Sequence, residues 1–487
     1  MTRDNVTRRA RGLILAAPAS GSGKTLLTAG LLRALRDRGE SVAAAKAGPD
    51  YIDPTFHEAA SGGVCLNLDL WAMRPATLEG LVGALEAAAS LVLCEGVMGL
   101  FDGTGRDGET GSTAALARVT GWPVVLVVDA RHQGASAAAL VAGFARHDPK
   151  LPLAGVVFNR VSGPRHRALI EAAMTRHLPD IPCLGALPQD AALALSERHL
   201  GLVPADEQAS AETVIARASQ AVAAYLDIDR LVGLARPAAL AAGEPAAPLM
   251  PLGQRIAVAR DESFRFTYKA VLAGWRRQGA ELNFFSPLAD EAPDPAADAI
   301  YLPGGYPELH GARLAAAEFF LAGLRRAAAD GTAIYGECGG YMVLGDALTD
   351  ADGRAHRMAG LLPLATSFAQ RRLHLGYRDA RLLDVGPLGP NGARFRGHEF
   401  HYAATLFTGA AAPLFALADA SGCDLGASGL RHGSVAGSFI HLIDRADDRS
   451  VARLRAPGES AVRRRERRSG ETRAVRDGAP SPTGSAG

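Results

Sequence analysis

The segment AAPASGSGKT, residues 16–25, has the residue types that bind a nucleotide polyphosphate. It follows a short apolar run and opens a helical pattern, and a glycine-rich loop in that setting directs backbone N–H groups and a helix N-terminus at phosphate oxygens. Lys24 can reach the β- and γ-oxygens, and the Thr25 hydroxyl can bind magnesium. Pro18 departs from the usual pattern, which has glycine there. The candidate nucleotide-binding residues are Ser20, Gly21, Ser22, Gly23, Lys24 and Thr25.

Two further segments place charged residues just after apolar runs. They are KAGPDYIDP (46–54), with Lys46, Asp50 and Asp53, and LVLCEGVMGLFDG (91–103), with Glu95 and Asp102. Ligands of open α/β sheets bind at the carboxyl ends of the strands, so these residues are expected beside the phosphate loop. Lys24 and Lys46 are two of only four lysines, and a compact ammonium suits phosphoryl transfer. The carboxylates suit magnesium or substrate, although Asp53 and Asp102 could each instead cap a helix or close a turn.

A second site is indicated by AIYGECGGYMVLG, residues 333–345. An apolar run, a glycine-rich turn with Cys338 and a helical pattern resemble a nucleophile elbow, in which the helix N-terminus favours the thiolate. The backbone N–H groups of Gly305, in LPGGYPE, and of Gly339 could bind an oxyanion. His441, in GSFIHL, is the expected base.

Other assignments remain open at this thiol site. A lone cysteine is more often buried and inert, and the surrounding glycines and His441 are what favour the catalytic interpretation. His398 and His401, in GHEFHY, are rival bases.

The elements that must position these residues follow an α/β pattern in both halves. Apolar runs at 12–17, 41–47, 91–96, 123–129 and 153–159 are continuous and not alternating, which predicts a parallel sheet covered on both faces. A second set of runs lies at 255–260, 281–286, 298–305 and 333–340. The expected domains are 1–228, a Pro- and Ala-rich linker at 229–252, a second domain at 253–446 and a disordered arginine-rich tail at 447–487.

Composition excludes several classes of protein. The 487 residues include 52 Lys+Arg and 51 Asp+Glu, and a formal charge of +1 argues against a dedicated nucleic-acid binder. Five scattered cysteines without a C-x-x-C pair favour a reducing cytoplasm and give no thiolate zinc site. No stretch reaches the ~20 strongly apolar residues of a membrane-spanning helix, so no membrane association is expected.

Six motifs occur in this order along the chain: APASGSGKT, KAGPDYIDP, EGVMGLFDG, LPGGYPE, GECGGYM and GHEFHY. With these motifs the chain resembles the corrinoid a,c-diamide synthases, which are the cobyrinate and hydrogenobyrinate enzymes, from residue 11 to about 443. The resemblance implies a dethiobiotin-synthetase-like P-loop domain joined to a class I glutamine amidotransferase domain. It implies an ATP-, Mg²⁺- and glutamine-dependent ligase that amidates the a and c acetate side chains of the corrin ring in cobalamin biosynthesis, through an acyl phosphate. A homodimer in the cytoplasm, with only small-molecule substrates, is the expected state.

The resemblance also implies roles by motif position. Lys24 and Thr25 would contact ATP, and Asn159 of GVVFNRV would contact its adenine. Magnesium would be held by Thr25, Asp50 and Glu95, and the substrate carboxylate would be surrounded by Lys46, Asp50, Tyr51, Asp53 and Asp102. Cys338 would be the nucleophile and His441 its base. One departure concerns the base. Many class I amidotransferases have a glutamate two residues after the histidine, whereas this chain has Ile443, and Asp444 or Glu399 are candidates to orient His441 instead.

Alternative functions remain at this stage. The related cobyric acid synthase and the synthase that acts on nickel sirohydrochlorin share this layout. The first half alone could be a P-loop switch ATPase with an inert amidotransferase domain, but that reading leaves Cys338 and His441 unexplained.

Deleting residues 448–487 is expected to leave turnover intact. The tail has many arginines and almost no large apolar residue, and none of the motifs lies in it. Steady-state rates of the truncated and full-length proteins, measured side by side, test this. A large loss of turnover in the truncated protein would show the prediction to be wrong.

Overall fold

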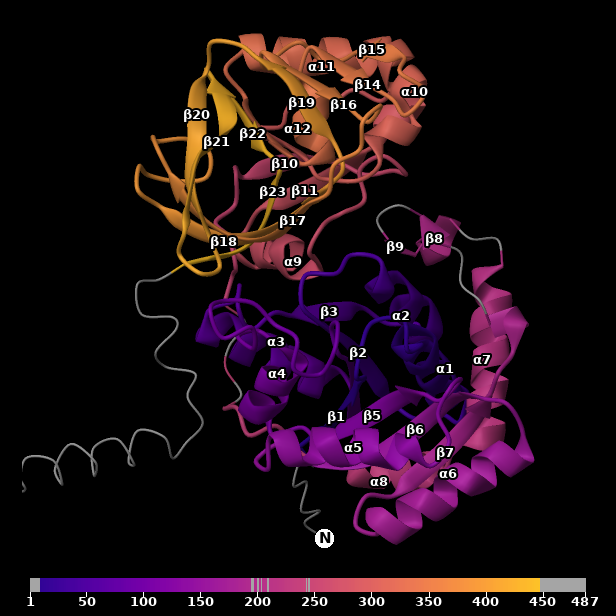
Figure 1. The fold of residues 1–487 in the computed structure, drawn as a ribbon. Coiled ribbons are helices and arrows are strands. Elements are labelled where there is room, and N and C mark those ends of the chain that lie inside the picture. The colour runs from indigo at the N-terminus through magenta and orange to yellow at the C-terminus, as the bar shows by residue number, and fades with distance from the viewer. Residues whose placement is uncertain are drawn as a thin grey trace, which may run out of the picture. The chain divides into compact units, whose positions relative to one another are not determined.

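The computed structural model describes residues 9–193, 197–198, 201–202, 204–207, 210–241, 243 and 246–446. The chain folds into two halves, each built around a large sheet of its own (Figure 1). The tail expected to be disordered, 447–487, lies outside the described residues.

The first half contains a seven-stranded sheet in the order β3-β2-β4-β1-β5-β6-β7, with every pair parallel. Its strands are β1 (Arg11–Ala16), β2 (Val42–Ala47), β3 (Cys65–Leu68), β4 (Leu91–Glu95), β5 (Val124–Asp129), β6 (Leu153–Val161) and β7 (Cys183–Pro188). The five apolar runs correspond to β1, β2, β4, β5 and β6, which confirms the predicted parallel sheet. The loops after β1, β2 and β4 leave the same edge from neighbouring strands, so their residues meet there.

Helices cover both faces of this sheet. They are α1 (Lys24–Asp37), α2 (Asp53–Ser61), α3 (Pro75–Ala88), α4 (Thr113–Thr120), α5 (Ser136–His147), α6 (Pro164–His177), α7 (Ala211–Tyr225) and α8 (Ile228–Leu234). In β1, Leu13 and Leu15 belong to the core with α1, α2, α7 and α8, whereas Ile14 and Ala16 belong to the core with α3 to α6. Because successive residues of a strand point to opposite faces and helices cover both faces, the residues on each face must be apolar. The segment expected as a linker begins inside α8, and a short hairpin, β8 (Glu197–Arg198) and β9 (Gly201–Leu202), lies before α7.

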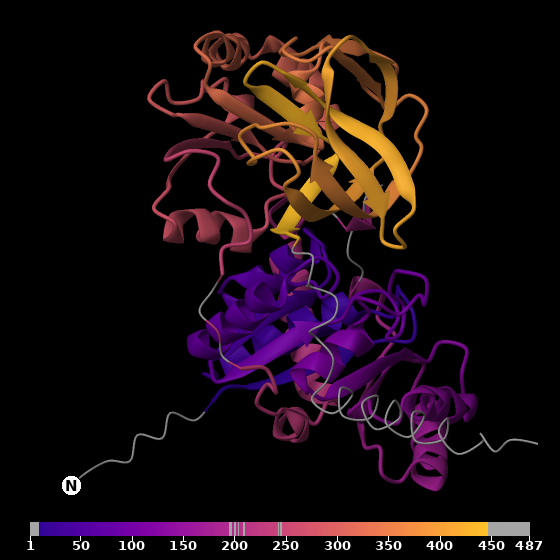
Figure 2. The same ribbon diagram turned by 90° about the vertical axis from the view of Figure 1, so that its left-hand side faces the viewer.

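The second half contains a ten-stranded mixed sheet in the order β11-β10-β12-β13-β22-β21-β20-β17-β18-β23 (Figure 2). Its parallel part is β10 (Arg255–Ala259), β11 (Glu281–Phe285), β12 (Ala299–Leu302), β13 (Ala333–Glu337) and β22 (Val435–Ser438). The remaining pairs are antiparallel and involve β17 (His374–Leu382), β18 (Arg394–His401), β20 (Ala412–Asp419), β21 (Asp424–His432) and β23 (Ile440–Arg445). The apolar runs predicted β10 to β13. They did not predict the antiparallel part, whose strands mix charged and apolar residues.

Helices and a small sheet complete the second half. The helices are α9 (Lys269–Arg277), α10 (Gly311–Ala316), α11 (Glu318–Ala329) and α12 (Gly339–Leu344). The small sheet contains β14 (Ala347–Thr349), β15 (Ala355–Arg357), β16 (Leu364–Ser367) and β19 (Ala404–Thr408). Throughout the described residues, no helix combines the length and the apolar character that crossing a membrane requires.

Polar contacts join the two halves. Asp444 of β23 is fully buried, and its carboxylate accepts hydrogen bonds from the Arg74 backbone N–H at 2.7 Å and from Arg74 Nε at 3.0 Å. The Tyr377 hydroxyl of β17 donates to Asp69 Oδ2 at 2.8 Å. A carboxylate can be buried in this way only because charged or polar donors satisfy it.

Replacing Arg74 by alanine is therefore expected to lower the free energy of unfolding by about 3 kcal/mol, because the Asp444 carboxylate stays buried but loses the guanidinium group that pairs with it. Urea unfolding measures the effect. Arg38→Ala is the control, since Arg38 pairs with Asp229, whose side chain is 94% exposed, and should change stability by less than about 1 kcal/mol. Equal effects of the two variants would contradict the importance of the buried pair.

Candidate active site

The loop between β1 and α1 lines a cavity of about 600 Å³. Gly21 and Gly23 have φ values of 77° and 89°, a region that side chains with a Cβ rarely adopt. Of the expected nucleotide-binding residues, Ser20, Gly21, Gly23, Lys24, Thr25 and Asn159 line this cavity. Its size lies in the range of small-molecule sites.

Lys24 begins α1 and is 7% exposed. Its ammonium donates to the Met98 carbonyl at 2.7 Å and, more weakly, to the Ala19 carbonyl at 3.4 Å. Burial lowers the pKa of Lys24, and the nearby Glu95 carboxylate opposes this shift. The ammonium is thus held in the cavity by carbonyl oxygens that phosphate oxygens could replace.

A buried charge network lies next to this lysine. Lys46 Nζ contacts Asp53 Oδ2 at 2.6 Å and Glu95 Oε1 at 3.1 Å, with Lys46 and Glu95 exposed by only 3% and 1%. The Thr25 hydroxyl donates to Glu95 Oε1 at 2.8 Å, and His57 Nε2 lies 2.6 Å from Glu95 Oε2. The sequence predicted Lys46, Asp53 and Glu95 as neighbours. It did not single out His57, which lies one turn into α2.

The pKa values of these groups reflect their mutual pairing. Burial alone would raise the pKa of Glu95, but Lys46 and His57 outweigh it and lower that pKa to about 2. Burial alone would lower the pKa of Lys46, yet Asp53 and Glu95 raise it overall. Glu95 and Lys46 are therefore both charged at neutral pH.

The oxygen atoms near Thr25 fit a magnesium ion. Thr25 Oγ1 lies 2.8 Å from Glu95 Oε1 and 3.3 Å from Asp53 Oδ2, and hard oxygen ligands of this kind suit magnesium beside a nucleotide. The Lys46 ammonium contacts both carboxylates, so a cation bound there would either displace the ammonium or share the carboxylate oxygens with it.

Asp50 and Asp102 serve the backbone in this structure. Asp50 Oδ1 accepts from the N–H groups of Ile52 and Asp53, which fixes the start of α2. Asp50 also lines the cavity. Asp102 is exposed, and its Oδ2 accepts from the Gly99 N–H at 2.9 Å. The turn role that the sequence left open for Asp102 is thus the one its contacts show.

Asn159 at the end of β6 holds the phosphate loop from the other side. Its Nδ2 donates to the Ser22 carbonyl at 2.9 Å. The following Arg160 has a positive φ of 59° and donates to the Gly21 carbonyl at 2.7 Å. Sequence reasoning did not single out Arg160, although its place beside Asn159 was a usable signal.

Cys338 occupies a strained turn between β13 and α12. Its φ of 47° and ψ of −102° are unusual for a residue with a side chain, as at a nucleophile elbow. A Cβ on Gly340 would lie 2.0 Å from the Leu302 carbonyl oxygen, so only glycine fits there. Burial raises the pKa of the Cys338 thiol. The resting sulfur is therefore a thiol that needs a base, and not the thiolate expected from a helix N-terminus.

The two expected oxyanion donors lie side by side. A Cβ added to Gly339 would be 3.1 Å from the backbone nitrogen of Gly305, which places these two backbone segments in contact. Such neighbouring N–H groups next to Cys338 could bind one developing negative charge.

His441 is brought to the same turn by β23. A Cβ on Gly304 would lie 2.3 Å from the imidazole Cε1, so glycine makes room for the ring. The Cys338 N–H donates to Ser438, three residues before His441 in sequence. On its other side, the ring lies 5.1 Å, centroid to centroid, from Tyr51. His441 therefore lies between the thiol turn and the loop that carries Asp50 and Asp53.

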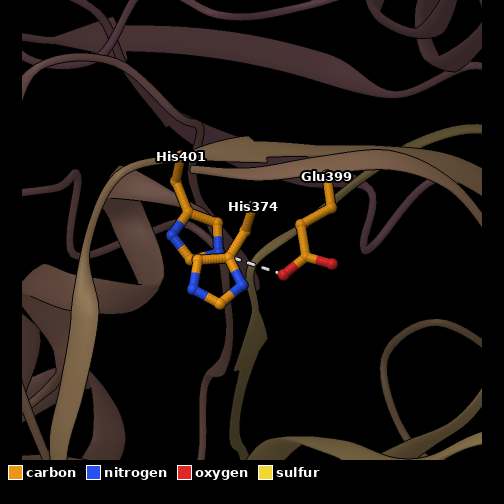
Figure 3. A group of neighbouring side chains, drawn as sticks. All are labelled: His374, Glu399 and His401. Atoms are coloured by element: carbon orange, nitrogen blue, oxygen red, sulfur yellow. Dashed lines mark hydrogen bonds and ion pairs between the residues drawn. The ribbon is translucent and has the colours of Figure 1, made fainter. Parts of the chain in front are cut away.

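His401, one of the two rival histidines, has other partners. His401 Nε2 lies 3.0 Å from Glu399 Oε1, and its ring stacks on His374 (Figure 3). The His401 ring also stacks on Phe439. His374, Glu399 and His401 could hold a metal ion by their spacing. Arg378, however, donates to Glu399 Oε2 at 2.7 Å and supplies the positive charge that a cation would bring. This cluster is better described as an ion-paired support of β17 and β18.

The two carboxylates that the sequence suggested as partners of His441 are engaged elsewhere. Asp444 binds Arg74, and Glu399 binds Arg378 and His401. Both suggestions were wrong, because each carboxylate is committed to a charged partner of its own.

Comparisons with known proteins match one domain in each half of the chain. Residues 13–203 match the CobQ/CobB/MinD/ParA nucleotide binding domain, and residues 255–448 match the CobB/CobQ-like glutamine amidotransferase domain. Among solved structures, PurLQS from Thermotoga maritima aligns with 39% of this chain and 87% of that chain, with a TM-score of 0.30 and 18% identity, a likeness too weak to carry an argument.

Curated relatives extend over both halves. Proteins named hydrogenobyrinate a,c-diamide synthase are 54% identical in Rhizobium meliloti (strain 1021), 55% in Brucella suis biovar 1 (strain 1330) and 54% in Rhodobacter capsulatus. Each alignment covers 89% of this chain and 98% or 99% of the relative. With a P-loop cavity, a cysteine turn and relatives of this similarity in one continuous alignment, the chain belongs to the family of hydrogenobyrinate a,c-diamide synthases.

Proposed function

We propose that this protein amidates the a and c acetate side chains of hydrogenobyrinate, with ATP as energy source and glutamine as nitrogen donor, in cobalamin biosynthesis. The proposal is carried by one observation: the chain matches relatives of that name over nearly their whole length. Two features of the chain support the proposal: a phosphate loop that could bind ATP and a Cys338 turn that could hydrolyse an amide.

In the first half-reaction, a side-chain carboxylate attacks the γ-phosphoryl group of ATP to give an acyl phosphate. Lys24 binds the transferring phosphoryl group, and Lys46 lies beside it to hold the incoming carboxylate. Magnesium, held by Thr25 and Glu95 with Asp50 or Asp53, would neutralise phosphate charge. Activation is required because an amine does not displace hydroxide from a carboxylate.

In the second half-reaction, the Cys338 sulfur attacks the side-chain amide of glutamine. Since burial keeps the sulfur protonated, His441 must accept its proton as the bond forms. Burial lowers the pKa of His441, so the resting imidazole is neutral and has a ring nitrogen free to accept the proton as sulfur bonds to the amide carbon. The N–H groups of Gly305 and Gly339 bind the oxyanion. His441 then returns the proton to the leaving nitrogen, ammonia departs, and water releases glutamate from the thioester.

Ammonia would pass between the sites along the Tyr51 side of His441. The Tyr51 ring packs on Phe266 and Tyr268 as well as on His441, with ring centroids 5.2, 4.4 and 5.1 Å away. Tyr51 stands between Asp50 and the start of α2, next to the phosphoryl-transfer site. A short, aromatic-lined path would keep ammonia unprotonated and away from water.

Mass spectrometry of corrinoid products tests the proposed function. The protein is incubated with ATP, Mg²⁺ and glutamine, with hydrogenobyrinic acid, cobyrinic acid or nickel sirohydrochlorin in parallel. Two amidations of hydrogenobyrinic acid are expected, as is a preference for it over the other two. Preferential amidation of the nickel tetrapyrrole would favour the nickel sirohydrochlorin enzyme, and ATP hydrolysis without any amidation would favour a P-loop switch ATPase. A further reaction with a corrin a,c-diamide as substrate tests for cobyric acid synthase, which would add four amides to it.

Replacing Cys338 by serine is expected to abolish glutamine-dependent amidation by at least about 10³-fold while preserving amidation from ammonium salts. The reason is that the phosphate-loop site does not use the thiol. Product formation with each nitrogen source is the measurement. Cys423→Ser is the matched control, because Cys423 is an exposed free cysteine and should affect neither reaction. Loss with both nitrogen sources in Cys338→Ser would rule out two separate sites.

A further inference from the structure

Glu337 is a buried carboxylate that neither proposed half-reaction uses. It ends β13, directly before Cys338, and is 2% exposed. Its Oε2 accepts a hydrogen bond from the Tyr301 hydroxyl at 2.8 Å, and its Oε1 accepts from the Leu442 N–H at 3.1 Å. These two donors fix both oxygens of the carboxylate, one from β12 and one from β23.

The imidazole of His441 is the ionisable partner that Glu337 faces. Glu337 Oε2 lies 4.0 Å from His441 Nδ1. Within the described part of the chain, Nδ1 has no hydrogen-bond partner, although His441 is 1% exposed. A buried ring nitrogen without a partner is uncommon, and here it lies within reach of a carboxylate that the chain has already fixed.

We infer that Glu337 is the positioning residue of His441, in the place of the glutamate that other class I amidotransferases carry two residues after the histidine. This inference rests on the proposed hydrolysis of glutamine at Cys338. When the site closes on glutamine, the Nδ1–H group donates to Glu337 Oε2, and Nε2 is left as the basic nitrogen. Ile443, at the usual position of the glutamate, is buried and apolar.

In this arrangement one proton moves from Cys338 to His441 and then to the leaving nitrogen. The S–H bond of Cys338 breaks as an Nε2–H bond forms on His441, and the imidazolium is stabilised by the Glu337 carboxylate, which keeps its negative charge throughout. The same Nε2 proton then passes to the nitrogen of the departing ammonia. Glu337 contacts neither substrate nor the reacting sulfur, so it acts only through the imidazole.

Burial raises the pKa of Glu337 to about 7, while the Tyr301 hydroxyl and the Leu442 N–H act to lower it. Burial lowers the pKa of His441, and positive charge on His398 or His401 lowers it further. The other titratable groups around the pair are Tyr51 and Tyr268 on its interdomain side, Tyr335 on β13, Cys338, and Glu399 on β18. Because only the ionised form of Glu337 can stabilise the imidazolium, glutamine hydrolysis should increase as the pH rises through about 7.

The test is Glu337→Gln in the full chain, which keeps the shape and one acceptor oxygen, replaces the other oxygen with an NH2 group and removes the charge. We expect kcat for glutamine hydrolysis to fall about 100-fold or more, with less than about a threefold change in the KM for glutamine. The rise of the rate through neutral pH should disappear. Amidation from ammonium salts should be unchanged, because it does not involve His441. Glu337→Asp, which retains the charge at a longer distance, should recover part of the rate.

Asp69→Asn is the matched control, since Asp69 is 1% exposed and also accepts from a tyrosine hydroxyl, that of Tyr377. It lies outside the thiol site and should leave the pH profile unchanged. If a folded Glu337→Gln protein keeps both the rate and the pH profile of the parent, the inference is overturned. If Asp69→Asn loses as much rate as Glu337→Gln, the loss reflects a general disturbance of the buried structure, and the positioning role of Glu337 is overturned.

A second variant covers the case in which Glu337→Gln does not fold. Tyr301→Phe removes a hydrogen bond that lowers the pKa of Glu337, so the rise in rate should move to higher pH, and an unmoved profile would contradict the inference. A parent protein that hydrolyses no glutamine would refute the proposed function, whereas a parent that hydrolyses glutamine with the same pH profile as Tyr301→Phe would refute the role of Glu337.

Discussion

Burial of the Lys46 ammonium against Asp53 and Glu95 is the interaction on which the arrangement of both sites depends. Ions are buried at a cost of several kcal/mol each unless partners satisfy them, so these three side chains must meet with little freedom. Lys46 is the penultimate residue of β2, Glu95 ends β4 and Asp53 begins α2, and the network therefore fixes the three segments that surround the phosphate loop. Thr25 joins it through Glu95, which ties α1 to the same point.

The same network determines where the thiol site finds its neighbour. Tyr51 lies two residues before Asp53, so the ion pair that holds Asp53 also holds the Tyr51 ring against His441. On the other side of the imidazole, Gly304 leaves the space that the ring fills. We propose that the two half-reactions are organised around this one short loop, so that a ligand that moves Asp53 would also shift the Tyr51 ring and the neighbouring His441 imidazole.

Local sequence predicted those parts of the site that local geometry determines. The phosphate loop and the Cys338 turn depend on glycines at fixed spacing, and the continuous apolar runs correspond to strands with both faces buried. The runs did not reveal β17 to β21, because antiparallel strands with one exposed face mix charged and apolar residues. The partners of His441 were also beyond the sequence. Asp444 was a plausible partner of His441 because it lies near it in sequence, yet it binds Arg74, which is 370 residues away. Glu337 was not singled out because it follows an apolar run that predicts a buried strand.

We propose that the two sites work as one, with ammonia passing between them out of contact with water. An isotope competition distinguishes this from release into solution: amide-¹⁵N glutamine is supplied together with excess unlabelled ammonium at a pH where free ammonia also reacts, and the a,c-diamide is analysed by mass spectrometry. We expect the new amides to carry ¹⁵N in large excess over the proportion expected from mixing with the solvent. Product in which the isotope ratio equals that of the ammonium in solution would contradict it.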